Sequence, residues 1–258
     1  IFALVSLARR FVYETEHSPV MAALIIRLFF DHSRQRRQAI ICAPEDASQC
    51  YDRMNHAPTS LAMRSMGVPD KPVHSMFATL QQAAHHVSTA YGISDDTYGG
   101  MERILQGLLA MAGIGQGNCC GPCSHSCLSL KCDRVCDKRG AGALICSPIS
   151  RQLTVLPRVS FVDDNSQCVS GHDIYARGED ILPKAQQEID DWQGCTAATG
   201  GAIESAKTCF WFVDYKWNGT TWTYRTEKEL RGFLTVIDKS NMRAVLQSLE
   251  PSEAFKIL

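Results

Sequence analysis

Apolar residues recur every three or four positions along several stretches of the chain, and this spacing predicts amphipathic helices. The first helix begins with Ser18 as N-cap and Pro19 in its first turn, and its apolar stripe runs from Met21 to Phe29. The same criterion predicts further helices at residues 59–66, about 71–88, 122 to about 138, 180 to about 199 and about 239–249.

Two continuous apolar runs predict buried strands, and carboxylates follow each run in the sequence. Residues 39–43 form one such run, which leads to Asp46, and a β-branched and aromatic run ends at Asp163 and Asp164. Asp is a common turn former, so a solvated turn is one interpretation of the adjacent pair. The other is a divalent cation site, because two neighbouring negative charges need a compensating cation. If Asp46 lies beside the pair, three carboxylates converge, and oxygen-rich sites of this kind suit Mg²⁺.

Glycines mark two further features. In residues 208–217 large apolar side chains alternate with polar or smaller ones, and Asn218-Gly219 then turns the chain into residues 221–224, which predicts a β-hairpin. The loop around Gly115, Gln116 and Gly117 lets the backbone approach a ligand closely. A flexible loop would have a similar composition, so this loop alone does not specify a ligand site.

Composition sets limits on the fold and its partners. The chain has 258 residues, of which 45% are hydrophobic, so it can form one large domain or two joined subdomains. A net charge of −1 provides no global positive field, but it leaves room for a local basic groove. No apolar run is long enough for a membrane span, so we expect no membrane partner. The chain begins with Ile rather than Met, and we expect a piece of a longer, intracellular protein.

Six of the twelve cysteines lie within residues 119–136. Their spacings match no pair of C-x2-C zinc knuckles. A helix that packs its cysteines as small apolar side chains is the interpretation we favour, and a structural zinc site is the alternative.

Motifs that follow one another along the chain resemble the palm of reverse transcriptases. The first is Asp46-Ala-Ser-Gln-Cys-Tyr51-Asp52, and the second combines Gly115-Gln116-Gly117 with Pro122. The third is Phe161-Val-Asp163-Asp164, and the fourth is Gly201-Ala-Ile-Glu-Ser-Ala-Lys207-Thr208. Shorter phrases such as Gln116-Gly117-Asn118 are similar to non-LTR-type retrotransposon polymerases of algal genomes. Each motif alone is weak, and their common order is what carries the resemblance.

The resemblance implies a role for each residue of these motifs. Asp46 and Asp163 would bind two Mg²⁺ ions, or Mn²⁺ in their place, with Asp164 as the supporting carboxylate. Tyr51 would lie beneath the incoming sugar and exclude a 2′-hydroxyl, which selects dNTPs. Lys207 would protonate the departing pyrophosphate, although an exposed lysine before a strand is an equally good structural interpretation.

The second motif completes the implied site and its partners. Gln116 would contact the nucleotide, and Gly115 and Gly117 would leave room for it. The partners would be an RNA template, a DNA primer and dNTPs. A catalytically inactive nucleic-acid-binding remnant and an RNA-directed RNA polymerase are the alternatives.

The implied fold class is α+β, a polymerase palm whose antiparallel sheet is backed by helices. Residues 1–38 would form a partial fingers region, and residues 39–225 the palm, with a fingers-type insertion at about 68–112. Residues 226–258 would form a truncated C-terminal helical region, with no thumb. The chain would thus be a polymerase fragment of a retroelement.

Overall fold

The computed structural model divides the chain into two compact units, the first made of residues 1–48 and 132–258 and the second of residues 49–131. The second unit includes the predicted insertion at about 68–112 and extends beyond it at both ends. The functional assignment of the predicted domains stays a prediction. The residues that the structure describes are 19–100, 113–115, 118–139, 142–147, 149–161, 164–172, 175–226 and 228–251.

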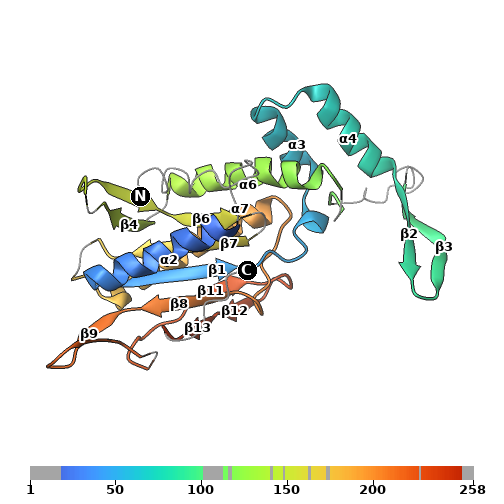
Figure 1. Ribbon diagram of the computed structural model, residues 1–258. Helices are drawn as coiled ribbons and strands as arrows, with labels where there is room; N and C mark the ends of the chain where they lie inside the picture. Colours follow the sequence, from blue (N-terminus) through green and yellow to red (C-terminus); the bar gives the residue numbers. More distant parts are fainter. Residues whose placement is uncertain are drawn as a thin grey trace. The chain divides into compact units, whose positions relative to one another are not determined.

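The first unit is built on a five-stranded sheet with β1 at its centre (Figure 1). The strand order is β13-β8-β1-β7-β6, and all neighbours are antiparallel except β13, which runs parallel to β8. The strands of this sheet are β1 (Ile40–Glu45), β6 (Arg158–Phe161), β7 (Asp164–Ser170), β8 (Cys209–Val213) and β13 (Gln247–Leu249).

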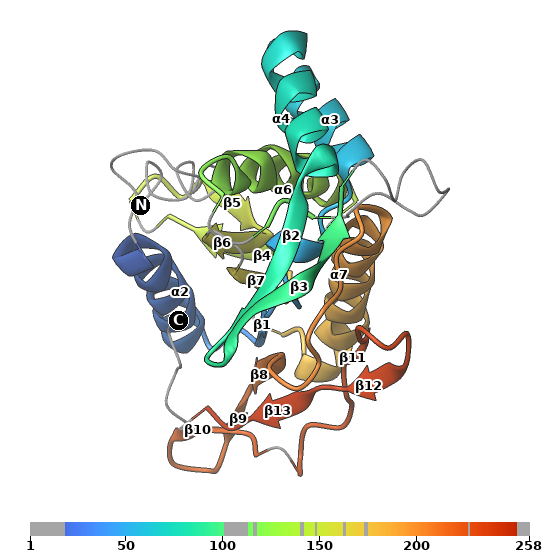
Figure 2. The same ribbon diagram turned by 90° about the vertical axis from the view of Figure 1, so that its right-hand side faces the viewer.

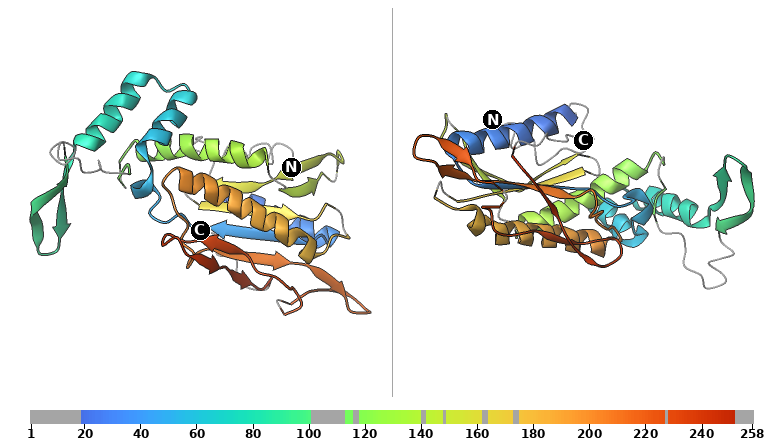
Figure 3. Two further views of the ribbon diagram at one scale, coloured as in Figure 1. Left: turned by 180° about the vertical axis from the view of Figure 1, so that it is seen from behind. Right: turned by 90° about the horizontal axis from the view of Figure 1, so that it is seen from below.

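Helices cover both faces of this sheet, because β1 is apolar on both sides. Ile40 and Cys42 pack in one core cluster with Phe29 of α2 (Pro19–Arg36). Ile41 points to the opposite face, where it packs in a second cluster with α7 (Gly178–Ala198). Figure 3 shows the sheet between these two helices. A strand buried on both faces explains why its sequence is continuously apolar.

Among its described residues, the first unit also has three small two-stranded sheets. They pair β4 (Ala143–Cys146) with β5 (Leu153–Leu156), β9 (Tyr215–Trp217) with β10 (Trp222–Tyr224), and β11 (Thr235–Ile237) with β12 (Arg243–Val245).

The second unit has its own core, in which Met63, Phe77 and Ile114 are buried. Its β2 and β3 strands form a long two-stranded ribbon (Figure 2). Helix α6 begins in this unit, and its residues from Cys132 onward belong to the first unit. The elements are the 3-10 turn η1 (Tyr51–Arg53), α3 (His56–Ser65), α4 (Asp70–Gln82), β2 (Ala84–Thr89), β3 (Gly92–Gly99) and α6 (Gly121–Asp137).

Most of the elements predicted from the apolar pattern are confirmed. The structure has helices at α2, α3, α6 and α7, and the predicted buried strand is β1. The hairpin predicted at Asn218-Gly219 is also confirmed, because Trp217 of β9 pairs with Trp222 of β10. Ser18, the predicted N-cap of the first helix, lies outside the described residues.

Two helix predictions are wrong in part or in full. The helix expected over 71–88 ends at Gln82, and the following residues pair as β2 with β3. The helix expected over 239–249 is replaced by β12 and β13, which pair with β11 and β8. Leu246, between these strands, is buried in the core that α7 covers. Short apolar patterns fit both periodicities, and the available strand partners decide between them.

In the part of the chain that the structure describes, no helix has the length and apolar character needed to cross a membrane.

Candidate catalytic carboxylate site

The ends of β1 and β7 bring two of the predicted carboxylates to the same edge of the sheet. Their antiparallel register pairs Glu45 with Asn165. Asp46 directly follows Glu45 and Asp164 directly precedes Asn165, so the two carboxylates lie at the same end of neighbouring strands. Phe161, the last residue of β6, pairs with Asp164, the first residue of β7. Asp163 itself lies outside the described residues, and its place in the site stays a prediction.

The backbone of Asp46 is held by the segment that resembles the fourth motif. The Asp46 carbonyl accepts a hydrogen bond from Glu204 N at 2.9 Å, and the Asp46 N–H donates to Thr208 Oγ1 at 3.3 Å. Ala47 also bridges to Ile203 in antiparallel fashion. Bonds on both sides of Asp46 therefore fix the direction in which its side chain leaves the backbone.

Lys207 lies beside Asp46. Its Nζ is 3.4 Å from Asp46 Oδ2, and the Lys207 side chain is 70% exposed while that of Asp46 is 28% exposed. An ion pair this exposed contributes little to stability. Its importance is positional, because it places a mobile positive charge next to the carboxylate edge of the sheet.

A buried polar residue precedes Asp46. Strand alternation directs Glu45 to the face that α7 covers, and its Oε1 accepts a hydrogen bond from Gln167 Nε2 at 3.0 Å. Among the described residues, Glu45 Oε2 has no hydrogen-bond partner. Burial raises the pKa of Glu45 to about 8, although the Arg158 guanidinium opposes the shift. Glu45 is therefore mainly neutral at neutral pH and adds little to the negative charge of the site.

Arg158, on β6, anchors this strand to the helices behind the sheet. Its side chain lies 3.2 Å from Asp133 Oδ1 and 3.7 Å from Glu188 Oε2, and its guanidinium is 4.7 Å from the centre of the Trp192 ring. Burial raises the pKa of Asp133 to about 6, while Arg158 opposes that rise. No sequence pattern indicated this group, since its members are far apart in the chain.

Tyr51 and the glycine-rich loop come together within the second unit. Tyr51 O accepts a hydrogen bond from Ile114 N at 2.8 Å, and Gly113 N donates to Met54 O at 3.0 Å. Gly113 has a φ of 91°, and a Cβ there would lie 2.3 Å from Asp52 O, so the close approach requires glycine. The Tyr51 ring lies 3.3 Å from the position of a Cβ on Gly121, at the start of α6.

The remaining residues of the second motif are only partly described. Gly115 follows the loop with a φ of 76°, a left-handed conformation that favours glycine. Gln116 and Gly117 lie outside the described residues, and their contact with a nucleotide stays a prediction.

The carboxylates and the cysteines are the two candidate metal-binding groups of the chain. Within the described residues, which do not include Asp163, no group of three or more His, Cys, Asp or Glu side chains is arranged to hold an ion. The described Asp46 and Asp164 nevertheless have the oxygen chemistry that Mg²⁺ requires. In α6, Cys127, Cys132 and Cys136 are buried. The cysteines of the structure are free thiols.

Comparisons with known proteins relate the fold to reverse transcriptases. No family model matches the chain, and no curated protein matches its sequence. Telomerase from Candida tropicalis, in complex with a TWJ fragment of telomeric RNA, is similar with a TM-score of 0.50 and 13% identity over 92% of this chain and 34% of that chain.

Other telomerase structures match less well. Apo telomerase from Candida tropicalis, truncated from its C-terminal domain, has a TM-score of 0.48 and 12% identity over 86% of this chain and 41% of that chain. Telomerase from Candida albicans, in complex with a TWJ fragment of telomeric RNA, has a TM-score of 0.42 and 11% identity over 99% of this chain and 38% of that chain. The chain thus spans 34% to 41% of these proteins. Telomerase is a reverse transcriptase, and the chain has a reverse-transcriptase-like α+β fold.

Proposed function

We propose that this chain is the polymerase domain of an RNA-directed DNA polymerase from a retroelement, which adds dNTPs to the 3′-hydroxyl of a primer. The observation that carries this proposal is that Asp46 and Asp164 lie next to the paired residues Glu45 and Asn165, at one end of neighbouring strands, with Lys207 3.4 Å from Asp46. A fold similar to that of a telomerase bound to RNA supports it.

The proposed roles follow from the motifs to which these residues belong. Asp46, Asp163 and Asp164 would hold two Mg²⁺ ions at the edge of the sheet. These ions, when bound, would activate the primer hydroxyl and stabilise the leaving oxygen in an in-line phosphoryl transfer. The backbone bonds on both sides of Asp46 would keep its carboxylate aimed at this edge.

Lys207 would act on the leaving pyrophosphate. Its side chain is largely exposed, so it can reach from Asp46 to a phosphate as negative charge develops there, and it can donate a proton. Tyr51 would contact the sugar, as the resemblance implies; its backbone carbonyl accepts a hydrogen bond from Ile114 N, next to Gly115. An RNA template and a DNA primer would complete the complex.

Primer extension tests the proposal directly. We expect the purified chain to extend an oligo(dT) primer on poly(rA) with Mg²⁺, and Asp163→Asn to abolish extension. Asp31→Asn is the matched control, because it removes a carboxylate from the exposed surface of α2 and should leave extension unchanged. If a folded wild-type chain extends nothing and Asp163→Asn behaves identically, the enzymatic proposal fails.

A further inference from the structure

Aromatic side chains line one face of the β9–β10 hairpin. Trp217 lies directly opposite Trp222, and Tyr215 lies directly opposite Tyr224. Alternate residues of a strand share a face, so all four rings lie on the same side of the hairpin. The ring centroids are 5.7 Å apart in the tryptophan pair and 5.3 Å apart in the tyrosine pair. We call these four residues the aromatic ladder.

The outer part of the aromatic ladder is open to solvent. Trp217 is 54% exposed, Trp222 is 47% exposed and Tyr224 is 39% exposed, whereas Tyr215 is buried. Paired aromatic residues stabilise a hairpin by cross-strand contact, but this role does not require large exposed areas. Exposed aromatic groups that lie together mark an interaction surface.

Positive charge adjoins the buried end of the aromatic ladder. The Arg37 guanidinium lies over the Tyr215 ring, 5.6 Å from its centre, and Ser33 Oγ is 3.0 Å from the Tyr215 hydroxyl. These contacts join the end of α2, where Arg34 and Arg36 are exposed, to the hairpin. Arg34 lies 3.6 Å from Asp31, whereas within the described part of the chain Arg36 and Arg37 have no carboxylate partner.

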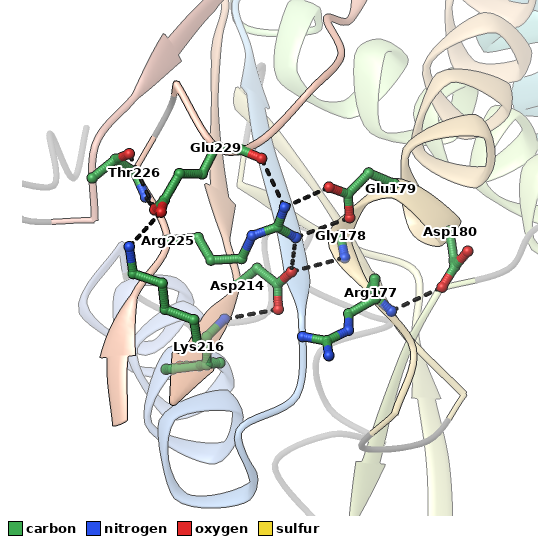
Figure 4. A network of polar contacts seen from close by, with 10 residues as sticks. Arg177, Gly178, Glu179, Asp180, Asp214, Lys216, Arg225, Thr226 and Glu229 are labelled. Carbon is green, nitrogen blue, oxygen red and sulfur yellow. Dashed lines mark hydrogen bonds and ion pairs between the residues drawn. The ribbon is translucent and has the colours of Figure 1, made fainter. Parts of the chain in front are cut away.

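The base of the hairpin is fixed by an ion-pair network (Figure 4). Arg225, directly after β10, lies 2.6 Å from Glu179 Oε1 on α7 and 2.7 Å from Asp214 Oδ2, between β8 and β9. Asp214 Oδ2 also accepts a hydrogen bond from Gly178 N at the start of α7. The hairpin is therefore held to the first unit, and its exposed face is presented in one orientation.

This surface is separate from the candidate catalytic site. Because β8 is antiparallel to β1, Val213 lies opposite Ile40, at the end of β1 that is remote from Asp46. The hairpin continues from that remote end (Figure 1). At about 3.3 Å per residue, the length of β1 alone puts it roughly 20 Å from Asp46.

We propose that the aromatic ladder, together with Arg36 and Arg37, binds single-stranded nucleic acid at a site distinct from the catalytic carboxylates. Unpaired bases would stack on Trp217 and Trp222, and the arginines would contact the phosphates. Aromatic rings beside basic groups are the combination by which proteins hold single strands without reading sequence. The charge of the arginines complements a polyanion, and this favours nucleic acid over an apolar protein partner.

The test measures binding without catalysis. The probe is a fluorescently labelled oligo(U) of about 20 nucleotides, in EDTA, so nucleotide addition plays no part. We expect the double variant Trp217→Leu with Trp222→Leu to bind at least about tenfold more weakly than wild type. Thr223→Val, on the opposite face of the same hairpin, should bind as wild type does. Arg36→Gln with Arg37→Gln should reduce the dependence of affinity on salt.

A duplex and a quencher supply the controls. An RNA duplex of the same length has its bases already stacked, so its binding should not respond to the leucine substitutions. The fluorescence of Trp217 and Trp222 is the difference in emission between wild type and the leucine variant. Acrylamide should quench this fluorescence, because both tryptophans are exposed in the free chain.

The proposal is overturned by equal oligo(U) affinity of the leucine variant and wild type, or by an equal loss of duplex binding. It is also overturned if acrylamide fails to quench these tryptophans, since another part of the chain, or a second copy, would then cover them. Primer extension has no bearing on any of these outcomes, so the binding site and the polymerase activity are tested separately.

Discussion

Asp46 is positioned by residues that are distant in the sequence. Its carbonyl and N–H bond to Glu204 and Thr208, and the preceding residue, Glu45, pairs with Asn165 next to Asp164. The sequence motifs identified Asp46 and Lys207 as candidates, and the structure brings these two together. The motifs could not predict that the pKa of the neighbouring Glu45 is raised, because burial of a carboxyl depends on the helix that covers the strand.

Lys207→Ala tests the proposed proton donor at the scale of one residue. We expect the rate of nucleotide addition to fall about 100-fold or more, because a positioned general acid contributes at least that much. Steady-state primer extension measures this loss. Lys239→Ala is the matched control, since Lys239 lies 2.6 Å from Glu204 in the same region and has no proposed role in the reaction. If Lys207→Ala keeps a rate within twofold of wild type, Lys207 is not the proton donor and forms only a surface ion pair.

Among the elements, the β9–β10 hairpin could be predicted from its local sequence, whereas the C-terminal strands could not. Asn218-Gly219 determines a tight turn locally, so the hairpin could be predicted from a few residues. Residues 239–249 form strands because β11 and β8 offer them hydrogen-bond partners. Neither partner can be recognised from the local apolar spacing, which fits a helix as well.

The network at the base of the hairpin predicts a loss of stability in acid. A hydrogen bond from Arg225 lowers the pKa of Glu179, and one from Lys216 lowers the pKa of Glu229 to about 2. Because these pKa values are lower in the folded chain, the stabilisation is complete above the unfolded value of about 4.5 and is lost as the pH falls toward about 2.

Arg225→Gln should weaken this acid response. The variant removes the partner of Glu179, so its melting temperature should fall less between neutral pH and about pH 3 than that of wild type. At neutral pH the free energy of unfolding of the variant should be about 3 kcal/mol lower than that of wild type, because Asp214 remains buried without its charged partner. Arg243→Gln, an exposed arginine of β12, controls for the loss of charge. An acid response in Arg225→Gln equal to that of wild type would contradict the assignment.

At the scale of the whole molecule, each of the two units has its own apolar core. Both faces of β1 are buried under α2 and α7, and the second unit has a separate core around Phe77. Free cysteines contribute to these cores as small apolar side chains, among them Cys42 and Cys168 on adjacent strands.

Removal of divalent metal should therefore separate folding from catalysis. We expect EDTA to abolish primer extension while the melting temperature changes by no more than about 2 °C, because the proposed ions lie at the exposed edge of the sheet. Circular dichroism before and after chelation measures the fold, and added Mg²⁺ should restore extension. Unfolding by EDTA, with release of zinc, would instead support the zinc site in the cysteine run.

The sequence by itself determined what is encoded locally. The stripe of α2, the apolar run of β1 and the turn at Asn218-Gly219 each depend on neighbours within a few residues, and all are present in the structure. The order of the motifs also indicated which carboxylates to examine. Only the tertiary structure brought Asp46 and Asp164 to the same end of neighbouring strands, raised the pKa of Glu45 by burial and joined Arg37 to the aromatic ladder. These features require strand register and burial, which arise when residues remote in the chain pack against one another.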